Sequence, residues 1–118
     1  MGRNILVIED EPAIQQMIKD VLELQGYLVF TASDGREGID KLRAIQPEPC
    51  VVLLDLMMPG TNGWQFLDMQ RSDSKLANIP VVVCSAYEES AKSVSPSGYV
   101  PKPIQLPSLL GAVKAFCA

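Results

Sequence analysis

Two short apolar runs in this chain end in carboxylates, and this repeated pattern constrains the fold more than any other feature. Residues 5–8 are Ile-Leu-Val-Ile, and Glu9 and Asp10 follow them. Residues 51–54 are Val-Val-Leu-Leu, and Asp55 follows them. Such runs are typical of strands buried on both faces of a parallel α/β sheet, where binding sites form at the carboxyl ends of the strands. We therefore expect the three acids to meet in one cluster.

Helical patterns alternate with strand-like runs along the chain. Pro12 suits the first turn of a helix, and apolar residues follow at helical spacing until Gly26. Asp34, with Glu37 three residues later, is expected to cap a second helix, and Asn62 a third. The other expected elements are strands at residues 27–32, 79–84 and 99–100 and a last helix over residues 106–116. This alternation predicts one α/β domain over residues 1–118, with a five-stranded, doubly wound parallel sheet. The expected strand order is 2-1-3-4-5, in which the first and third strands are neighbours and the three acids can meet.

The connection between the fourth and fifth strands is short. Thirteen residues, 86–98, separate Ser85 from Tyr99, and this segment is rich in serine. A parallel crossover needs about a dozen residues including its helix, so at most about two helical turns fit there. We therefore expect the fourth helix to be shortened or missing. Pro101 places the fifth strand at an edge of the sheet, because proline cannot donate to a ladder.

The charge and hydropathy of the chain argue against nucleic-acid and membrane partners. The 10 basic and 14 acidic residues give a net charge of -4, and the basic side chains are scattered, so we expect no direct nucleic-acid binding. Residues 1–4 lead into the first strand without a secretory leader, and no apolar run has the length of a membrane span. We expect a cytoplasmic protein that does not insert into membranes and has protein or metal partners.

Three cysteines, Cys50, Cys84 and Cys117, lie in or beside apolar segments. Their number is odd, and their spacing does not match that of metal ligands. The expectation is that all three are reduced thiols of the core.

The acid cluster needs a cation, and its surroundings suit a phosphoryl group. Carboxylates at short range raise the pKa of at least one member unless a cation is bound, and Mg²⁺ is the natural candidate because it shares its shell with phosphate oxygens. Lys102 comes after the expected fifth strand, and Ser85 comes after the expected fourth. Both can bind phosphoryl oxygens at the same edge of the sheet. This set permits in-line attack by the Asp55 carboxylate on a phosphoryl donor, giving an acyl phosphate.

Several separated motifs occur in one order along the whole chain. They are residues 9–12 (Glu-Asp-Glu-Pro), 53–60 (Leu-Leu-Asp-Leu-Met-Met-Pro-Gly), 62–63 (Asn-Gly), 85–86 (Ser-Ala) and 99–103 (Tyr-Val-Pro-Lys-Pro). Together they resemble the receiver domain of bacterial two-component response regulators, which has a flavodoxin-like fold. The resemblance implies that Asp55 is the phosphoacceptor. It also implies that Glu9, Asp10 and the backbone carbonyl of Met57 bind Mg²⁺ with Asp55.

The resemblance further implies how the phosphoryl group is held and sensed. Lys102 would bind the phosphate, with a cis bond to Pro103. Ser85 would be the switch hydroxyl, and Tyr99 the aromatic residue that changes rotamer with it. The implied function is a phosphorylation-dependent signalling switch that receives its phosphoryl group from a histidine kinase or phosphotransfer protein and acts by contacting a downstream protein. Such a chain is a phosphoacceptor that takes part in its own phosphorylation and dephosphorylation rather than an enzyme.

Two bulky residues occupy positions that, in the receiver family, flank the approach of the water that hydrolyses the aspartyl phosphate. They are Met57 and Tyr87. We expect slow loss of the phosphoryl group, because Tyr87 can screen the site.

Three other functions are compatible with parts of the same sequence. A pseudo-receiver that binds partners without phosphorylation is the alternative that a damaged fourth helix would favour. A phosphohydrolase commonly has a second Asp two residues after the nucleophile, where this chain has Met57, which cannot transfer a proton. Flavin binding is disfavoured because Glu9 and Glu11 would repel a phosphate.

Overall fold

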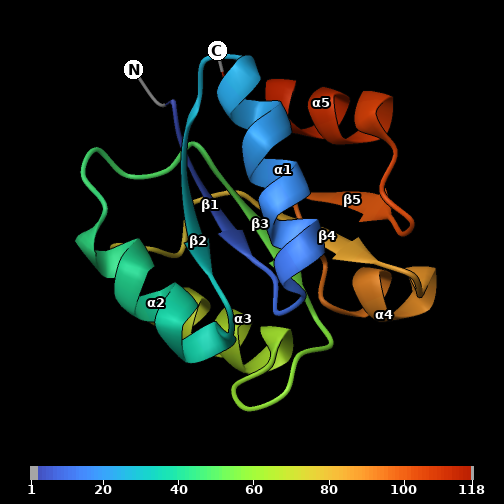
Figure 1. Cartoon of the computed structure of the whole chain (residues 1–118). Helices are drawn as coiled ribbons and strands as arrows, with labels where there is room; N and C mark the ends of the chain where they lie inside the picture. Colours follow the sequence, from blue (N-terminus) through green and yellow to red (C-terminus); the bar gives the residue numbers. More distant parts are fainter. Residues whose placement is uncertain (1–2, 118) are drawn as a thin grey trace.

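A single parallel sheet forms the centre of the molecule (Figure 1). The computed structural model describes residues 3–117. The strands are β1 (Asn4–Ile8), β2 (Leu28–Ala32), β3 (Val51–Asp55), β4 (Val81–Ser85) and β5 (Gly98–Pro101). Their order is β2-β1-β3-β4-β5, which confirms the expected order and the edge position of β5. Met1 and Gly2, where a leader would begin, lie outside the described residues.

Helices cover both faces of the sheet (Figure 1). They are α1 (Pro12–Leu24), α2 (Gly35–Ala44), α3 (Gly63–Ser72), α4 (Glu88–Ser93) and α5 (Leu106–Lys114). Buried side chains of α1 and α5 pack on one face, and those of α2, α3 and α4 pack on the other. None of these helices within residues 3–117 has the length and apolar character needed to cross a membrane.

The continuous apolar runs are explained by burial on both faces. In β1, Ile5 and Val7 point into the cluster beneath α1 and α5, whereas Leu6 and Ile8 point into the cluster beneath α2 and α3. None of the four is more than 1% exposed. Because alternate residues of a strand face opposite sides, a strand covered on both faces needs apolar residues at every position.

Two expected helix caps are present. The Asp34 side chain accepts a hydrogen bond from the Glu37 N–H at 2.8 Å. The Asn62 side chain accepts one from the Gln65 N–H at 2.9 Å, and the Gln65 side chain accepts one from the Asn62 N–H at 2.8 Å. The second arrangement is a capping box, and it fixes the start of α3 directly after the loop that follows β3.

Some element boundaries differ from the prediction. The fourth strand begins at Val81 rather than at residue 79, because the Ile79 N–H bonds to the Leu76 carbonyl in a turn and Pro80 has no N–H to give. The last helix ends at Lys114 rather than at residue 116.

The fourth helix is shortened but not missing. It has six residues, and its buried residue Ala91 packs into the core. An Arg71 Nη atom from the last turn of α3 donates to the carbonyls of Val94, at 2.5 Å, and Ser95, at 3.4 Å. The connection between α4 and β5 is therefore held by a side chain of the neighbouring helix.

The expectation of three reduced cysteines is wrong for two of them. Cys50 and Cys117, 67 residues apart, form a disulfide with a Cα–Cα distance of 5.5 Å. Cys84 is a buried free thiol, as expected. Spacing along the chain does not reveal this pair, because only the packing of α5 on the sheet brings the chain after α5 next to the chain before β3.

Candidate functional site

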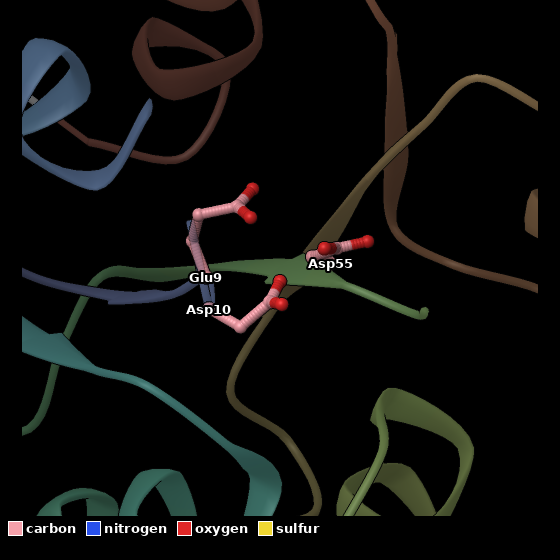
Figure 2. Close-up of side chains that lie close together, drawn as sticks. All are labelled: Glu9, Asp10 and Asp55. Atoms are coloured by element: carbon pink, nitrogen blue, oxygen red, sulfur yellow. The ribbon is translucent and has the colours of Figure 1, made fainter. Parts of the chain in front are cut away.

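Three carboxylates meet at the carboxyl end of the sheet. Glu9 and Asp10 follow β1, and Asp55 ends the neighbouring β3, with which β1 pairs in parallel. One carboxylate oxygen from each residue lies within 4.8 Å of the others (Figure 2). Glu9 is 2% exposed and Asp55 is 6% exposed, whereas Asp10 is half-buried. The cluster predicted from the two apolar runs is therefore confirmed.

The acids are held in a setting that favours a bound cation. Burial, helped by the charge of Asp55, raises the pKa of Glu9 to about 7, although the hydrogen bond from Lys102 acts to lower it. Buried, converging carboxylate oxygens are the donor set that a hard divalent cation prefers. The residues present therefore fit Mg²⁺, which would be held by Glu9, Asp10 and Asp55.

Lys102 lies inside the acid cluster. Its Nζ is 2.8 Å from Glu9 Oε1 and 3.4 Å from Asp55 Oδ2, and its side chain is 19% exposed. Burial alone would lower the pKa of Lys102, but the hydrogen bond and charge of Glu9, together with Asp55, outweigh burial and raise it. The Lys102–Pro103 peptide bond is cis, as the family resemblance implies. The ion pair with Glu9 was not predicted, although opposite charges at one sheet edge are a signal for it.

Ser85 and Tyr99 are joined at the ends of β4 and β5. The Tyr99 hydroxyl donates to the Ser85 backbone carbonyl at 2.9 Å. Ser85 is 3% exposed, and its Oγ accepts a hydrogen bond from the Tyr87 N–H at 3.0 Å. The serine expected to bind phosphate and the tyrosine expected to move with it are thus in direct contact, through the serine main chain.

A cleft of about 270 Å³ contains the site. Its lining consists of Glu9, Asp10, Glu11, Asp55, Met57, Ser85, Ala86, Tyr87 and Lys102. The Met57 N–H donates to Asp55 Oδ1 at 3.1 Å, which holds the Met57 main chain beside the Asp55 carboxylate. Met57 is 55% exposed and Tyr87 is 60% exposed, so both side chains extend into solvent. Every predicted site residue except Tyr99 therefore lines one cleft.

Two supporting residues were missed by sequence reasoning. Gln15 Nε2 donates to the Glu9 carbonyl at 2.8 Å and to the Ala32 carbonyl at 3.1 Å, which ties α1 to the ends of β1 and β2. The Glu11 N–H donates to Glu9 Oε2 at 3.2 Å. No local pattern marks Gln15, because its partners are set by how α1 packs. Glu11 could have been suspected from its place directly after the acidic pair.

The buried glutamate gives a testable pH dependence. Between its ordinary pKa of 4.5 and about 7, Glu9 keeps its proton in the folded protein and loses it in the unfolded chain. The folded state then binds more protons, so without Mg²⁺ the free energy of unfolding is expected to fall by about 1–3 kcal/mol as the pH rises through this window. Urea denaturation with a chelator on either side of the window measures the change.

Glu9→Gln is the matched variant, because it keeps the shape of the side chain and cannot ionise. We expect a flatter profile for it and a reduced decline in the wild type when Mg²⁺ is added. The same decline in Glu9→Gln would contradict the assignment to this residue.

Comparison with known proteins identifies the family. The model of the response regulator receiver domain matches residues 5–114, so the chain belongs to the response-regulator receiver family. The phosphate regulon transcriptional regulatory protein PhoB of Klebsiella pneumoniae is 34% identical over 98% of this chain and 52% of its own length. The hybrid signal transduction histidine kinase D of Dictyostelium discoideum is 35% identical over 92% of this chain and 7% of its own length. This chain thus spans about half the length of PhoB.

Solved structures agree with this assignment. The chemotaxis response regulator CheY4 of Vibrio cholerae has a TM-score of 0.87 at 26% identity and covers 99% of this chain and 100% of its own. The receiver domain of the hybrid histidine kinase CckA has a TM-score of 0.79 at 30% identity, over 95% of this chain and 96% of its own. The fold with strand order 2-1-3-4-5 is therefore that of the CheY-like receivers.

Proposed function

We propose that this domain is a phosphorylation-dependent signalling switch whose acceptor is Asp55. The observation that carries the proposal is the meeting of an acceptor carboxylate, two further acids, Lys102 and Ser85 in one cleft. In this proposal Mg²⁺ is held by Glu9, Asp10 and Asp55, with the Met57 carbonyl as a further ligand. When bound, the ion would neutralise charge on the acids and on the phosphoryl oxygens.

The residues of the cleft account for phosphoryl transfer. An Asp55 carboxylate oxygen attacks phosphorus in line, and the bond from phosphorus to the donor's leaving group breaks as that group departs with the electron pair. Lys102, already 3.4 Å from Asp55, would stabilise the negative charge on the phosphoryl oxygens. Ser85 Oγ would turn from Tyr87 to donate to one of those oxygens. The product is an aspartyl phosphate at Asp55.

The proposal extends to the partners and the output of the domain. The donor would be a histidine kinase or a histidine phosphotransfer protein, because a phosphohistidine gives its phosphoryl group readily to a carboxylate held beside a cation. The output would be contact with a downstream protein. Ser85 is bonded to Tyr99 through its carbonyl, so movement of Ser85 toward the phosphoryl group would alter the Tyr99 contact at β5. The proposal includes a cytoplasmic location, where kinases have ATP, and treats the domain as a phosphoacceptor rather than an enzyme.

Mass spectrometry of the intact protein tests the acceptor. After treatment with acetyl phosphate and Mg²⁺, we expect the wild type to gain the mass of one phosphoryl group and Asp55→Asn to gain none. Asp68→Asn is the matched control, because Asp68 is exposed on α3 and should leave the modification intact. No gain in the wild type, and no binding of beryllofluoride, would favour the pseudo-receiver alternative instead.

The lifetime of the phosphoryl group is expected to depend on Tyr87. Tyr87 lines the cleft that contains Asp55, and its exposed side chain lies at the solvent side, where it would screen the phosphoryl group from water. We expect Tyr87→Ala to lose the phosphoryl group several-fold faster than the wild type, and Tyr87→Phe to resemble the wild type because it keeps the ring. The measurement is the decay of phosphorylated protein by intact mass after removal of the donor. Equal or faster decay in the wild type would contradict the screening role.

A further inference from the structure

The disulfide lies at the opposite end of β3 from the acceptor. Cys50 immediately precedes β3 (Val51–Asp55), and Cys117 lies three residues beyond the end of α5 at Lys114. The bond therefore joins the strand that carries Asp55 to the chain that follows the last helix. No residue that lines the Asp55 cleft takes part in it.

The surroundings suit a thiol as well as a disulfide at Cys50. Its Sγ lies 3.4 Å from the Asn4 carbonyl oxygen, so a reduced Cys50 can donate its S–H there. Cys50 is partly exposed and can be reached by a small molecule, whereas Cys117 is buried at the edge of the apolar cluster beneath α1 and α5. Both oxidation states are thus accommodated without an unpaired polar group at Cys50.

The remaining cysteine does not compete for this chemistry. Cys84 is fully buried in β4, and burial raises the pKa of its thiol to about 12. Only a thiolate exchanges with disulfides, so Cys84 stays inert. Exchange is therefore confined to the pair at the far end of the sheet.

We propose that Cys50 and Cys117 form a reversible thiol–disulfide exchange site whose reactant is a low-molecular-weight disulfide. The Cys50 thiolate attacks one sulfur of the reactant, and the first small thiolate leaves. The Cys117 thiolate then attacks Cys50 Sγ in the mixed disulfide, and the second small thiolate leaves. In sum, the protein loses two electrons and two protons, and one small disulfide becomes two thiols. The site gives the domain a second chemical input besides phosphorylation.

The part of the molecule controlled by this site is the end of α5. Three backbone hydrogen bonds close that end, from the N–H groups of Ala115, Phe116 and Cys117 to carbonyls of the last helical turns. In the oxidised protein this segment is covalently tied to the start of β3, so it cannot open without carrying Cys50 with it. In the reduced protein it can open alone.

The first test is a redox titration read by intact mass. Protein equilibrated with glutathione at a series of oxidised-to-reduced ratios is denatured and alkylated. We expect a graded change from three alkyl groups to one as the oxidised form increases. A Cys50→Ser and Cys117→Ala double variant keeps only Cys84 and should take one alkyl group at every ratio. Three groups at every ratio would show that the bond does not form, and one at every ratio would show a permanent disulfide; either result overturns the proposal.

The second test is hydrogen exchange of the oxidised and reduced wild type. Amides of residues 115–117 are expected to exchange about tenfold or more faster in the reduced protein, while amides of β1 and β3 are unchanged. Equal exchange at residues 115–117 would overturn the controlling role. Both measurements are repeated on Asp55→Asn, which cannot form the aspartyl phosphate. A failure of exchange chemistry is thereby separated from a failure of the proposed phosphorylation.

Discussion

Lys102→Ala is expected to slow phosphorylation of Asp55 by about a hundredfold or more. Lys102 Nζ lies 3.4 Å from Asp55 Oδ2 and is the cation positioned to stabilise the phosphoryl oxygens. Its removal also leaves Glu9 without the hydrogen bond that opposes the rise of its pKa, so Glu9 would hold its proton to a higher pH. The rate of phosphorylation by acetyl phosphate at fixed Mg²⁺, measured as a function of pH, reports both effects.

Lys92→Ala is the matched control for this experiment. Lys92 forms an ion pair with Glu88 on the surface of α4, with both side chains more than half exposed, so its loss should have little effect. A Lys102→Ala rate within a factor of about two of the wild-type rate would contradict the role of Lys102 in transfer.

Gly63→Ala is expected to lower the free energy of unfolding by about 2–3 kcal/mol. A Cβ at Gly63 would lie 2.6 Å from the Leu56 Cα and 2.7 Å from the Asp55 carbonyl oxygen, and both are backbone atoms. Either α3 must move away from the end of β3, or the Asp55–Leu56 peptide must shift. Urea denaturation measures the loss of stability, and the phosphorylation rate should fall with it because the acceptor is displaced.

Gly111→Ala is the matched control in another helix. Gly111 is exposed within α5, and no atom lies within 4 Å of a Cβ placed there. Alanine should therefore stabilise the protein by about 0.5–1 kcal/mol through helix propensity and a less flexible unfolded chain. If both variants shifted stability in the same direction by similar amounts, the close approach at Gly63 would not be the cause.

The sheet and its acid cluster were predictable from the sequence for two reasons. The strands follow from local apolar patterns, and the cluster follows from the general rule that binding sites form at the carboxyl ends of parallel strands. Apolar runs buried on both faces identify β1 and β3, and the carboxyl ends of parallel strands share an edge, so Glu9, Asp10 and Asp55 had to converge. The helix caps at Asp34 and Asn62 were likewise predictable, because each side chain accepts a hydrogen bond from the N–H only three residues later.

The contacts that sequence reasoning missed join residues far apart in the chain. The Cys50–Cys117 bond spans 67 residues, and the hydrogen bond between Lys102 and Glu9 spans 93. Each depends on how a helix or loop finally packs, which no local spacing records. Lys102 was expected at the same edge of the sheet as Asp55, and in the structure it pairs with Glu9 as well as with Asp55.

α3 gives the strand that carries Asp55 a second physical connection to the segment before β5. The helix starts at Gly63, packed against the backbone that follows Asp55, and it ends near Arg71, which holds the carbonyls after α4. The first connection from Asp55 to that segment is through β4, which pairs with both β3 and β5. The second is α3, which contacts the backbone after Asp55 at one end and the segment after α4 at the other. The shortened crossover is therefore in contact, at its end, with the helix that begins beside Asp55.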